Sequence, residues 1–128
     1  MRKMIIRAAF LFGTLVTAFS CYYEYPPEQT PFNPDDVSFS THILPILSGK
    51  CGTTDCHDGT HVPNLQAENA YRELSSGGYY NVTFPEQSEL YKAIVEGVGG
   101  LEMPPSGSLS QLDKELILTW IRKGAPND

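Results

Sequence analysis

The sequence predicts an all-α domain of short helices joined by long loops, and three observations support this fold class. From Val37 onward the apolar residues recur at helical spacing. Glycines follow several of these apolar segments, where helices typically stop. The segment that begins at Ser110 carries helix signals at both ends. A domain of about ninety residues has a small apolar core, so a large buried cofactor would help it to fold.

The first twenty residues are typical of an export signal. Arg2, Lys3 and Arg7 form a basic start, and an apolar run from Ala8 to Phe19 follows. This run is too short to span a bilayer, which favours a signal peptide over residues 1–20; the alternative is a buried first helix. Export would place the mature protein in an oxidising compartment, in the periplasm or at the cell surface.

The segment "AFSC", Ala18 to Cys21, resembles the lipobox of bacterial lipoproteins, with Ala18 where an aliphatic residue is usual. We therefore expect Cys21 to be lipidated and to anchor the mature protein in a membrane, whereas ordinary cleavage would leave a free thiol. Residues 21–36 contain four prolines without apolar periodicity and are typical of an extended tether. The folded domain would then comprise residues 37–128.

Acidic residues outnumber basic ones, 15 to 9, which gives a net charge of −6. Removal of the three basic residues of the signal would lower the net charge to −9. Such a charge argues against nucleic acid as a partner. It fits docking onto a basic surface of a partner protein, although solubility alone explains it equally well.

The first helix of the domain is predicted in "SFSTHILPILSGK". Ser40 is the expected N-cap, and the helix should end at Gly49 and lead directly into Cys51. Pro45 is acceptable only near the first turn, because amide protons there have no partner within the helix. The apolar face is expected to contain Phe39, Ile43, Leu44, Ile46 and Leu47.

Two further helices are predicted in the middle of the domain. The first covers residues 67–75 and is closed by the glycine pair at 77–78. The second lies within residues 85–97, begins at its opening proline or at Ser88, and stops at Gly97. Its predicted apolar face contains Leu90, Tyr91, Ile94 and Val95.

The last helix has the most complete signals. Ser110 and Asp113 match a capping box with Asp in place of Glu. Arg122 and Lys123 lie where the helix dipole favours positive charge, and Gly124 ends the helix. Its predicted apolar stripe contains Leu112, Leu116, Ile117, Trp120 and Ile121.

The segment "KCGTTDCHDGT" combines Cys51 and Cys56 with His57 directly after them. Two thiols a short loop apart can each add to a haem vinyl group, and a histidine beside the second thioether can bind the iron. Four residues separate the cysteines here, where the usual attachment motif has two. Gly52 and the small polar residues up to Asp55 would let this longer loop bulge outward.

Two other chemistries fit these cysteines. A disulfide between Cys51 and Cys56 is sterically feasible but leaves His57 unexplained. A zinc site would need Cys51, Cys56, His57 and His61. Neighbouring Cys56 and His57 would strain tetrahedral coordination, which makes zinc the weaker hypothesis.

A second axial ligand for iron can be sought elsewhere in the sequence. Met103 is the only methionine outside the predicted signal, and it lies in "GGLEMPPSGSL", where two prolines stiffen the chain after it. We predict that Met103 is the distal ligand. One alternative is that Met103 only fills the core, and another is that His61 is the distal ligand. His42, on the first helix, is expected to be a surface or packing residue.

The segments "ILPILSGKC", "CHDG", "PEQSELYKAI", "MPP" and "LILTWIRKGAPND" occur in this order. Together they resemble the planctomycete-type branch of class I c-type cytochromes, over residues 37–128. The shared Met-Pro-Pro corresponds to residues 103–105, and the shared Trp-Ile begins at Trp120. The shared Pro-x-x-Ser-x-Leu-Tyr corresponds to Pro85, Ser88, Leu90 and Tyr91. The lengthened cysteine loop departs from the family pattern.

This resemblance implies a class I cytochrome c-like bundle around one covalent haem c. Cys51 and Cys56 would form the thioethers, and His57 and Met103 would be the proximal and distal iron ligands. The resemblance also implies that the first and last helices cross beside the haem, with Trp120 near the crossing. A backbone carbonyl, for which Pro63 is the candidate, would accept the imidazole proton of the proximal histidine.

The function implied is single-electron transfer between redox partner proteins by a membrane-tethered monohaem carrier. Because His57 and Met103 would saturate the iron, we expect no enzyme activity, except a peroxidase-like one if Met103 dissociates. The alternative is a haem-free lipoprotein binding module with a Cys51–Cys56 disulfide.

Overall fold

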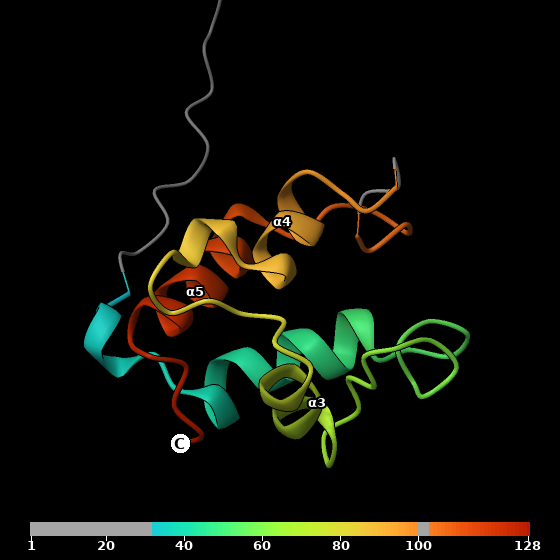
Figure 1. Ribbon diagram of the computed structural model, residues 1–128, viewed down its shortest axis with the longest axis horizontal. Helices are drawn as coiled ribbons and strands as arrows, with labels where there is room; N and C mark the ends of the chain where they lie inside the picture. Colours follow the sequence, from blue (N-terminus) through green and yellow to red (C-terminus); the bar gives the residue numbers. More distant parts are fainter. Residues whose placement is uncertain (1–31, 100–102) are drawn as a thin grey trace, which may run out of the picture.

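The computed structural model describes residues 32–99 and 103–128. In this part of the chain every regular element is a helix, so the all-α prediction is confirmed there (Figure 1). The predicted signal peptide, Cys21 and the tether up to residue 31 lie outside the described residues. Within the described ranges, none of the helices combines the length and hydrophobicity that crossing a bilayer requires.

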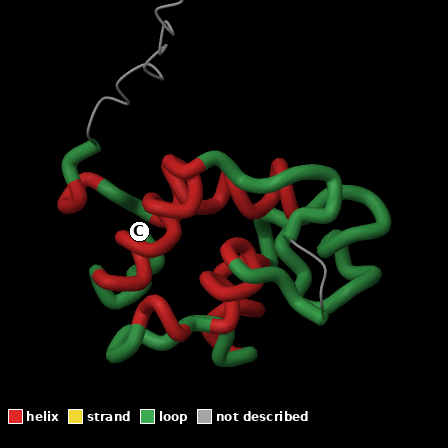
Figure 2. The backbone as a smooth tube through the Cα atoms, turned by 90° about the horizontal axis from the view of Figure 1, so that it is seen from above, coloured by secondary structure: helices red, strands yellow, loops and turns green. Residues whose placement is uncertain are grey.

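Seven helical segments form the body of the domain after a short 3₁₀ turn, η2 (Pro34–Asp36). They are η3 (Phe39–Ile43), α2 (Leu44–Ile46), η4 (Leu47–Cys51), α3 (Ala70–Ser76), η5 (Pro85–Gln87), α4 (Glu89–Val95) and α5 (Gln111–Arg122). The first three are continuous and together form the first helix of the domain. Figure 2 shows the helices grouped on one side and the long loops after the first helix and after α4 at the other end.

The first helix spans Phe39–Cys51, so the predicted limits at Ser40 and Gly49 were wrong at both ends. Ser38 is the N-cap, and its Oγ accepts a hydrogen bond from the Thr41 amide at 3.2 Å. The predicted cap, Ser40, donates its own amide to the backbone oxygen of Asp128 at 2.8 Å. The helix therefore begins earlier because a distant residue satisfies its first amides.

Pro45 lies inside the first helix. The sequence had predicted it in the first turn, and this prediction was wrong. The turns on both sides of α2, in η3 and η4, have π-helical hydrogen bonding. Such wider turns are irregularities that accommodate a residue lacking an amide proton. The helix can thus continue through Pro45 and deliver Cys51 at its last position.

The middle helices follow the predictions with shifted starts. α3 begins at Ala70 because a turn closed by the Ala70 amide and the Gln66 carbonyl, 2.8 Å apart, precedes it. The predicted helix over 85–97 is divided into η5 and α4, with Ser88 as the N-cap of α4. Leu90 and Ile94 are buried, but Val95 is 43% exposed, so its assignment to the apolar face was wrong.

The last helix, α5, confirms its predicted capping box. Ser110 Oγ accepts from the Asp113 amide at 3.1 Å, and Asp113 Oδ2 accepts from the Ser110 amide at 3.1 Å. Arg122 lies in the last turn, and Gly124 follows with a φ of 94°. Of the predicted stripe, Ile117, Trp120 and Ile121 are fully buried, and Leu112 and Leu116 are half-buried.

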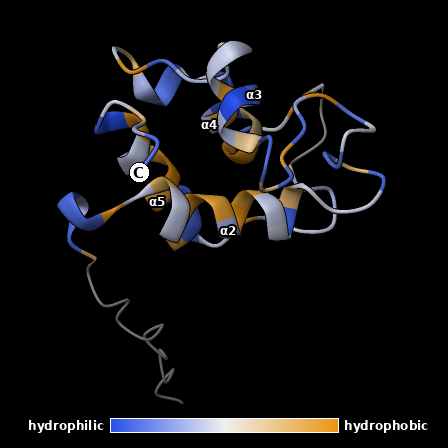
Figure 3. Ribbon diagram, turned by 90° about the horizontal axis from the view of Figure 1, so that it is seen from below, coloured by the Kyte–Doolittle hydropathy of each residue, from blue (hydrophilic) through white to orange (hydrophobic). Residues whose placement is uncertain are grey.

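The core is organised around the Trp120 ring. Its centroid lies 5.3 Å from that of Phe39 on the first helix, 5.3 Å from that of Tyr80 and 6.5 Å from that of Tyr71. The indole Nε1 donates to the Pro126 carbonyl at 2.9 Å, so the one polar atom of this side chain is satisfied. Figure 3 shows hydrophobic segments on α2 and α5, and α5 packs directly against η3.

The segment after α5 returns to the start of the domain. Lys123 Nζ donates to the carbonyls of Asp35 at 2.7 Å and Val37 at 2.6 Å. Asp128 Oδ1 accepts from the Phe39 amide at 2.7 Å. Residues 123–128 thus hold the segment that leads into the first helix.

Candidate functional site

The loop from Cys51 to His57 is closed by its own backbone hydrogen bonds. The Gly52 amide donates to the Leu47 carbonyl at 2.7 Å, which finishes the first helix. The His57 amide then donates to the Cys51 carbonyl at 3.1 Å, across the loop between the two cysteines. Cys51 and His57 are therefore held together by the fold of this loop and not only by sequence proximity.

Two residues make the four-residue bulge possible. Asp55 has a φ of 63°, the left-handed conformation that Asp tolerates better than most residues. Gly52 lies so close to the following segment that a Cβ atom would be 2.8 Å from the carbonyl oxygen of Leu65. Gly52 is thus needed for close backbone approach, a reason that the sequence did not reveal. The Leu65 amide donates to the His57 carbonyl at 2.7 Å, which ties this segment to the loop.

The Gly52→Ala variant is expected to lose about 1–3 kcal/mol of unfolding free energy, because the added methyl group would overlap backbone that cannot rotate away. Urea denaturation measures this loss. Gly49→Ala, only three positions earlier, is the matched control: its Cβ meets nothing within 4 Å. We expect this control to gain about 0.5–1 kcal/mol, because alanine favours a helix more than glycine does. Equal effects of the two substitutions would contradict the close approach at Leu65.

His57 is oriented by the carbonyl of Pro63. Its Nδ1 lies 3.0 Å from that carbonyl oxygen. Because a carbonyl only accepts, Nδ1 carries the proton in this hydrogen bond, and Nε2 carries the lone pair. A histidine that donates through one nitrogen to a backbone carbonyl is set to bind a metal through the other. The half-buried His57 therefore has the tautomer that a metal ligand needs.

The two cysteines differ in environment. Cys51 is buried among core residues, and burial raises the pKa of its thiol to about 11, against the opposing effect of Lys50. Cys56 is half-buried. Both are free thiols in the structure.

The zinc hypothesis receives no support. In residues 32–99 and 103–128, no three side chains of His, Cys, Asp or Glu lie together in a way that could hold a metal ion. His61 is exposed, and its amide donates to the Cys56 carbonyl at 3.2 Å. His42 Nδ1 accepts from the Ser38 amide at 3.1 Å, so His42 helps to form the start of the first helix.

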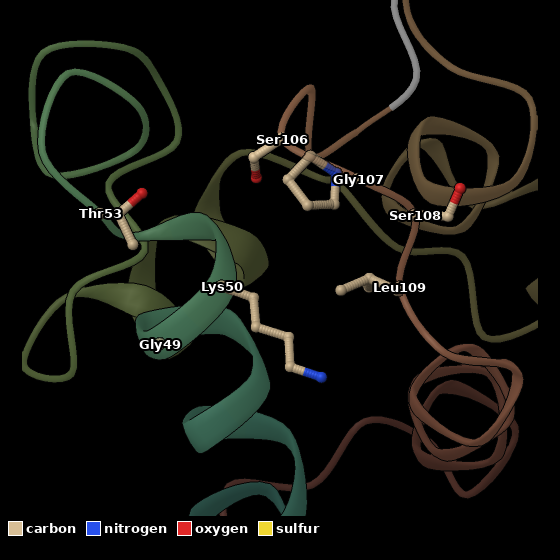
Figure 4. Close-up of a pocket in the computed structure, with 8 residues that line it drawn as sticks. Gly49, Lys50, Thr53, Ser106, Gly107, Ser108 and Leu109 are labelled. Atoms are coloured by element: carbon tan, nitrogen blue, oxygen red, sulfur yellow. The ribbon is translucent and has the colours of Figure 1, made fainter.

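Met103 is half-buried, and its amide donates to the carbonyl of Ala93 on α4 at 3.3 Å. A cis peptide bond joins it to Pro104. The chain after Met103 and the chain around the first cysteine line one cavity of about 330 Å³ (Figure 4). The lining residues are Gly49, Lys50, Thr53, Pro104, Ser106, Gly107, Ser108 and Leu109. The fold thus brings the segments next to Cys51 and Met103 to opposite walls of the same space.

The four candidate donors are of the types that hold a covalent haem. They comprise two thiols, an imidazole with a free Nε2 lone pair, and the thioether of Met103. None of the four donor residues lines the cavity itself. The cavity itself is mostly polar, with Pro104 and Leu109 as its larger apolar residues. Small-molecule sites are usually more apolar, so the fit depends on the donor groups and not on the cavity lining.

Two contacts of the site could not be found from the sequence. Gly52 approaches Leu65, and Lys50 Nζ contacts Asp113 Oδ2 at 2.5 Å, across a sequence separation of 63 residues. The only signal was that Lys50 precedes the cysteine loop and that Asp113 belongs to the predicted capping box. Trp120 lies in the aromatic core, and its relation to a haem stays a prediction.

Comparison with protein-family models, with curated proteins and with solved structures finds no match to this chain.

Proposed function

We propose that the protein is a membrane-tethered monohaem c-type cytochrome that carries single electrons, within a class I cytochrome c-like bundle. The observation that supports this most is the 3.0 Å hydrogen bond between His57 Nδ1 and the Pro63 carbonyl. It leaves Nε2 with its lone pair, beside a cysteine that is one residue away. A disulfide alone leaves this arrangement unexplained.

The residues have distinct roles in this proposal. Cys51 and Cys56 attach the haem through thioethers, His57 binds the iron on one side, and Met103 fills the other. A bound haem supplies a one-electron iron couple, whose potential Met/His ligation raises. Because His57 and Met103 would both bind the iron of a bound haem, no iron site would stay open for a substrate. We therefore infer an electron carrier and not an enzyme.

The remaining parts of the chain fit delivery to a membrane surface. Residues 1–20 would direct export, Cys21 would carry the lipid, and the part of the predicted tether before η2 would let the domain move between donor and acceptor. Redox partner proteins with basic docking surfaces suit a mature chain of net charge −9, which is the −6 of the full chain without Arg2, Lys3 and Arg7.

Expression of the full chain together with a haem-attachment system tests the proposal. We expect a red protein whose mature mass is increased by one haem, and a Cys51→Ser, Cys56→Ser double variant that is colourless. A colourless wild-type protein two protons lighter than its reduced mass would contain the disulfide instead. That result would overturn the cytochrome assignment in favour of a haem-free binding module.

A further inference from the structure

An ion pair connects the cysteine-bearing end of the first helix to the start of α5. Lys50 Nζ lies 2.5 Å from Asp113 Oδ2, and Lys50 directly precedes Cys51. Asp113 is the third residue of α5 and also accepts from the Ser110 amide and hydroxyl, at 3.1 and 2.7 Å. Lys50 therefore contacts a carboxylate that is itself fixed to the N-terminus of a helix.

The ionised form of the Asp113 carboxyl group is stabilised by the Lys50 ammonium. Asp113 is buried, and burial alone would raise the pKa of its carboxyl group. Hydrogen bonds from Lys50 and Ser110 outweigh that effect and hold the pKa below its ordinary value. Removal of the Lys50 ammonium would leave a buried charge without its cation, so the contact resists separation of the two helices.

The ion pair lies beside the loop that carries Met103. Lys50 lines the same cavity as Pro104 and Leu109, and Figure 4 shows its side chain extending from the last turn of the first helix toward the side on which Leu109 lies. Leu109 is buried, and Ser110 of the capping box follows it directly. The loop that carries Met103 thus ends at the capping box, whose Asp113 contacts Lys50.

We propose that Lys50 and Asp113 are positioning residues for the haem site, because their ion pair sets the separation between the cysteine loop and the Met103 loop. This inference rests on the proposed function. His57 takes its orientation from Pro63, within its own segment, so the ion pair matters little for it. Met103 comes from a separate segment, so its ability to hold a bound haem would depend on the separation of the two loops that Lys50 and Asp113 maintain.

The Lys50→Met variant tests this in the haem-loaded protein, since it keeps the aliphatic stem and leaves the capping box intact. We expect weaker ligation by Met103, seen as a lower reduction potential and as about tenfold tighter binding of added imidazole to the ferric protein. Lys50→Arg should restore both values. Imidazole affinity and potential equal to wild type in Lys50→Met, or no restoration by Lys50→Arg, would overturn the proposal.

Glu86→Gln is the matched control. It breaks the ion pair between Arg122 and Glu86, which joins the other end of α5 to η5 and is exposed on both sides. Loss of this pair should leave the potential and the imidazole affinity unchanged. Equal changes in Glu86→Gln and Lys50→Met would reveal general loosening of α5 and would contradict a specific role for Lys50.

A second readout needs no haem. In the haem-free protein we expect Lys50→Met to speed alkylation of the buried Cys51 about tenfold per thiolate, while Glu86→Gln does not. The rate is mapped by fragment-ion mass spectrometry and measured over a range of pH, because loss of the Lys50 charge by itself raises the pKa of the Cys51 thiol. If the wild type takes up no haem, the proposed function fails, but this rate still tests whether Lys50 fixes the end of the helix. An unchanged Cys51 rate in Lys50→Met would overturn the positioning role by itself.

Discussion

The Met103→Ala protein is expected to keep its covalent haem, to change from low-spin to high-spin iron and to bind added imidazole. The thioethers and His57 are supplied by the other loop, so only the distal position opens. In the wild type, imidazole must compete with Met103 for the iron. Each ~1.4 kcal/mol by which the Met103-bound form is favoured over the form without Met103 weakens imidazole binding tenfold. We therefore expect at least about tenfold tighter binding in the variant. Optical and electron paramagnetic resonance spectra measure the spin state.

Met103→His is the control for this substitution. An imidazole in place of the thioether should keep the iron low-spin but lower its reduction potential, because Met/His ligation raises the potential. Unchanged low-spin spectra in Met103→Ala would exclude Met103 from the site. His61 would then be the ligand to examine, although the structure has it exposed.

The Trp120→Ala variant is expected to lose about 3–5 kcal/mol of unfolding free energy. The Trp120 ring is fully buried, and it contacts Phe39, Tyr71 and Tyr80, so its removal leaves a cavity between the first and last helices. The Pro126 carbonyl also loses its donor. Since domains typically have about 5–15 kcal/mol of stability, this loss would remove a large fraction of the total.

Two other aromatic substitutions set the scale of this effect. Trp120→Phe keeps most of the ring volume and should cost less than Trp120→Ala. Phe84→Ala removes an aromatic ring that is 55% exposed and should change stability by less than about 0.5 kcal/mol. Chemical denaturation of the haem-free proteins measures all three. A Trp120→Ala loss no larger than that of Phe84→Ala would show that the aromatic cluster does not carry the core.

Local signals made some elements predictable from the sequence. The capping box and the glycine stop of α5 lie within or next to the helix that they define, so Ser110, Asp113 and Gly124 identified both ends. The motif formed by Cys51, Cys56 and His57 also lies within one short segment of the sequence. The sequence therefore sufficed for the last helix, whereas the role of the cysteine loop stays a prediction.

Contacts between distant residues could not be read in this way. The first helix starts at Phe39 because Asp128, 89 residues later, accepts from its amide. It passes Pro45 through π-helical turns, which no local propensity predicts. The pairing of Lys50 with Asp113 likewise depends on how the first helix and α5 pack. Hydrophobic periodicity predicts which faces are buried, but not which charged groups meet at their edges.

The contacts of residues 123–128 with the start of the domain also affect the order in which the domain folds. A chain is synthesised with its N-terminus first, so Phe39 and Cys51 emerge before Lys123 and Asp128. Until that segment arrives, the first amides of the first helix have no acceptor, and Trp120 cannot complete the core. Such non-local contacts delay cooperative folding. The core cluster that contains Cys51 is therefore complete only after the residues of the last helix have been synthesised.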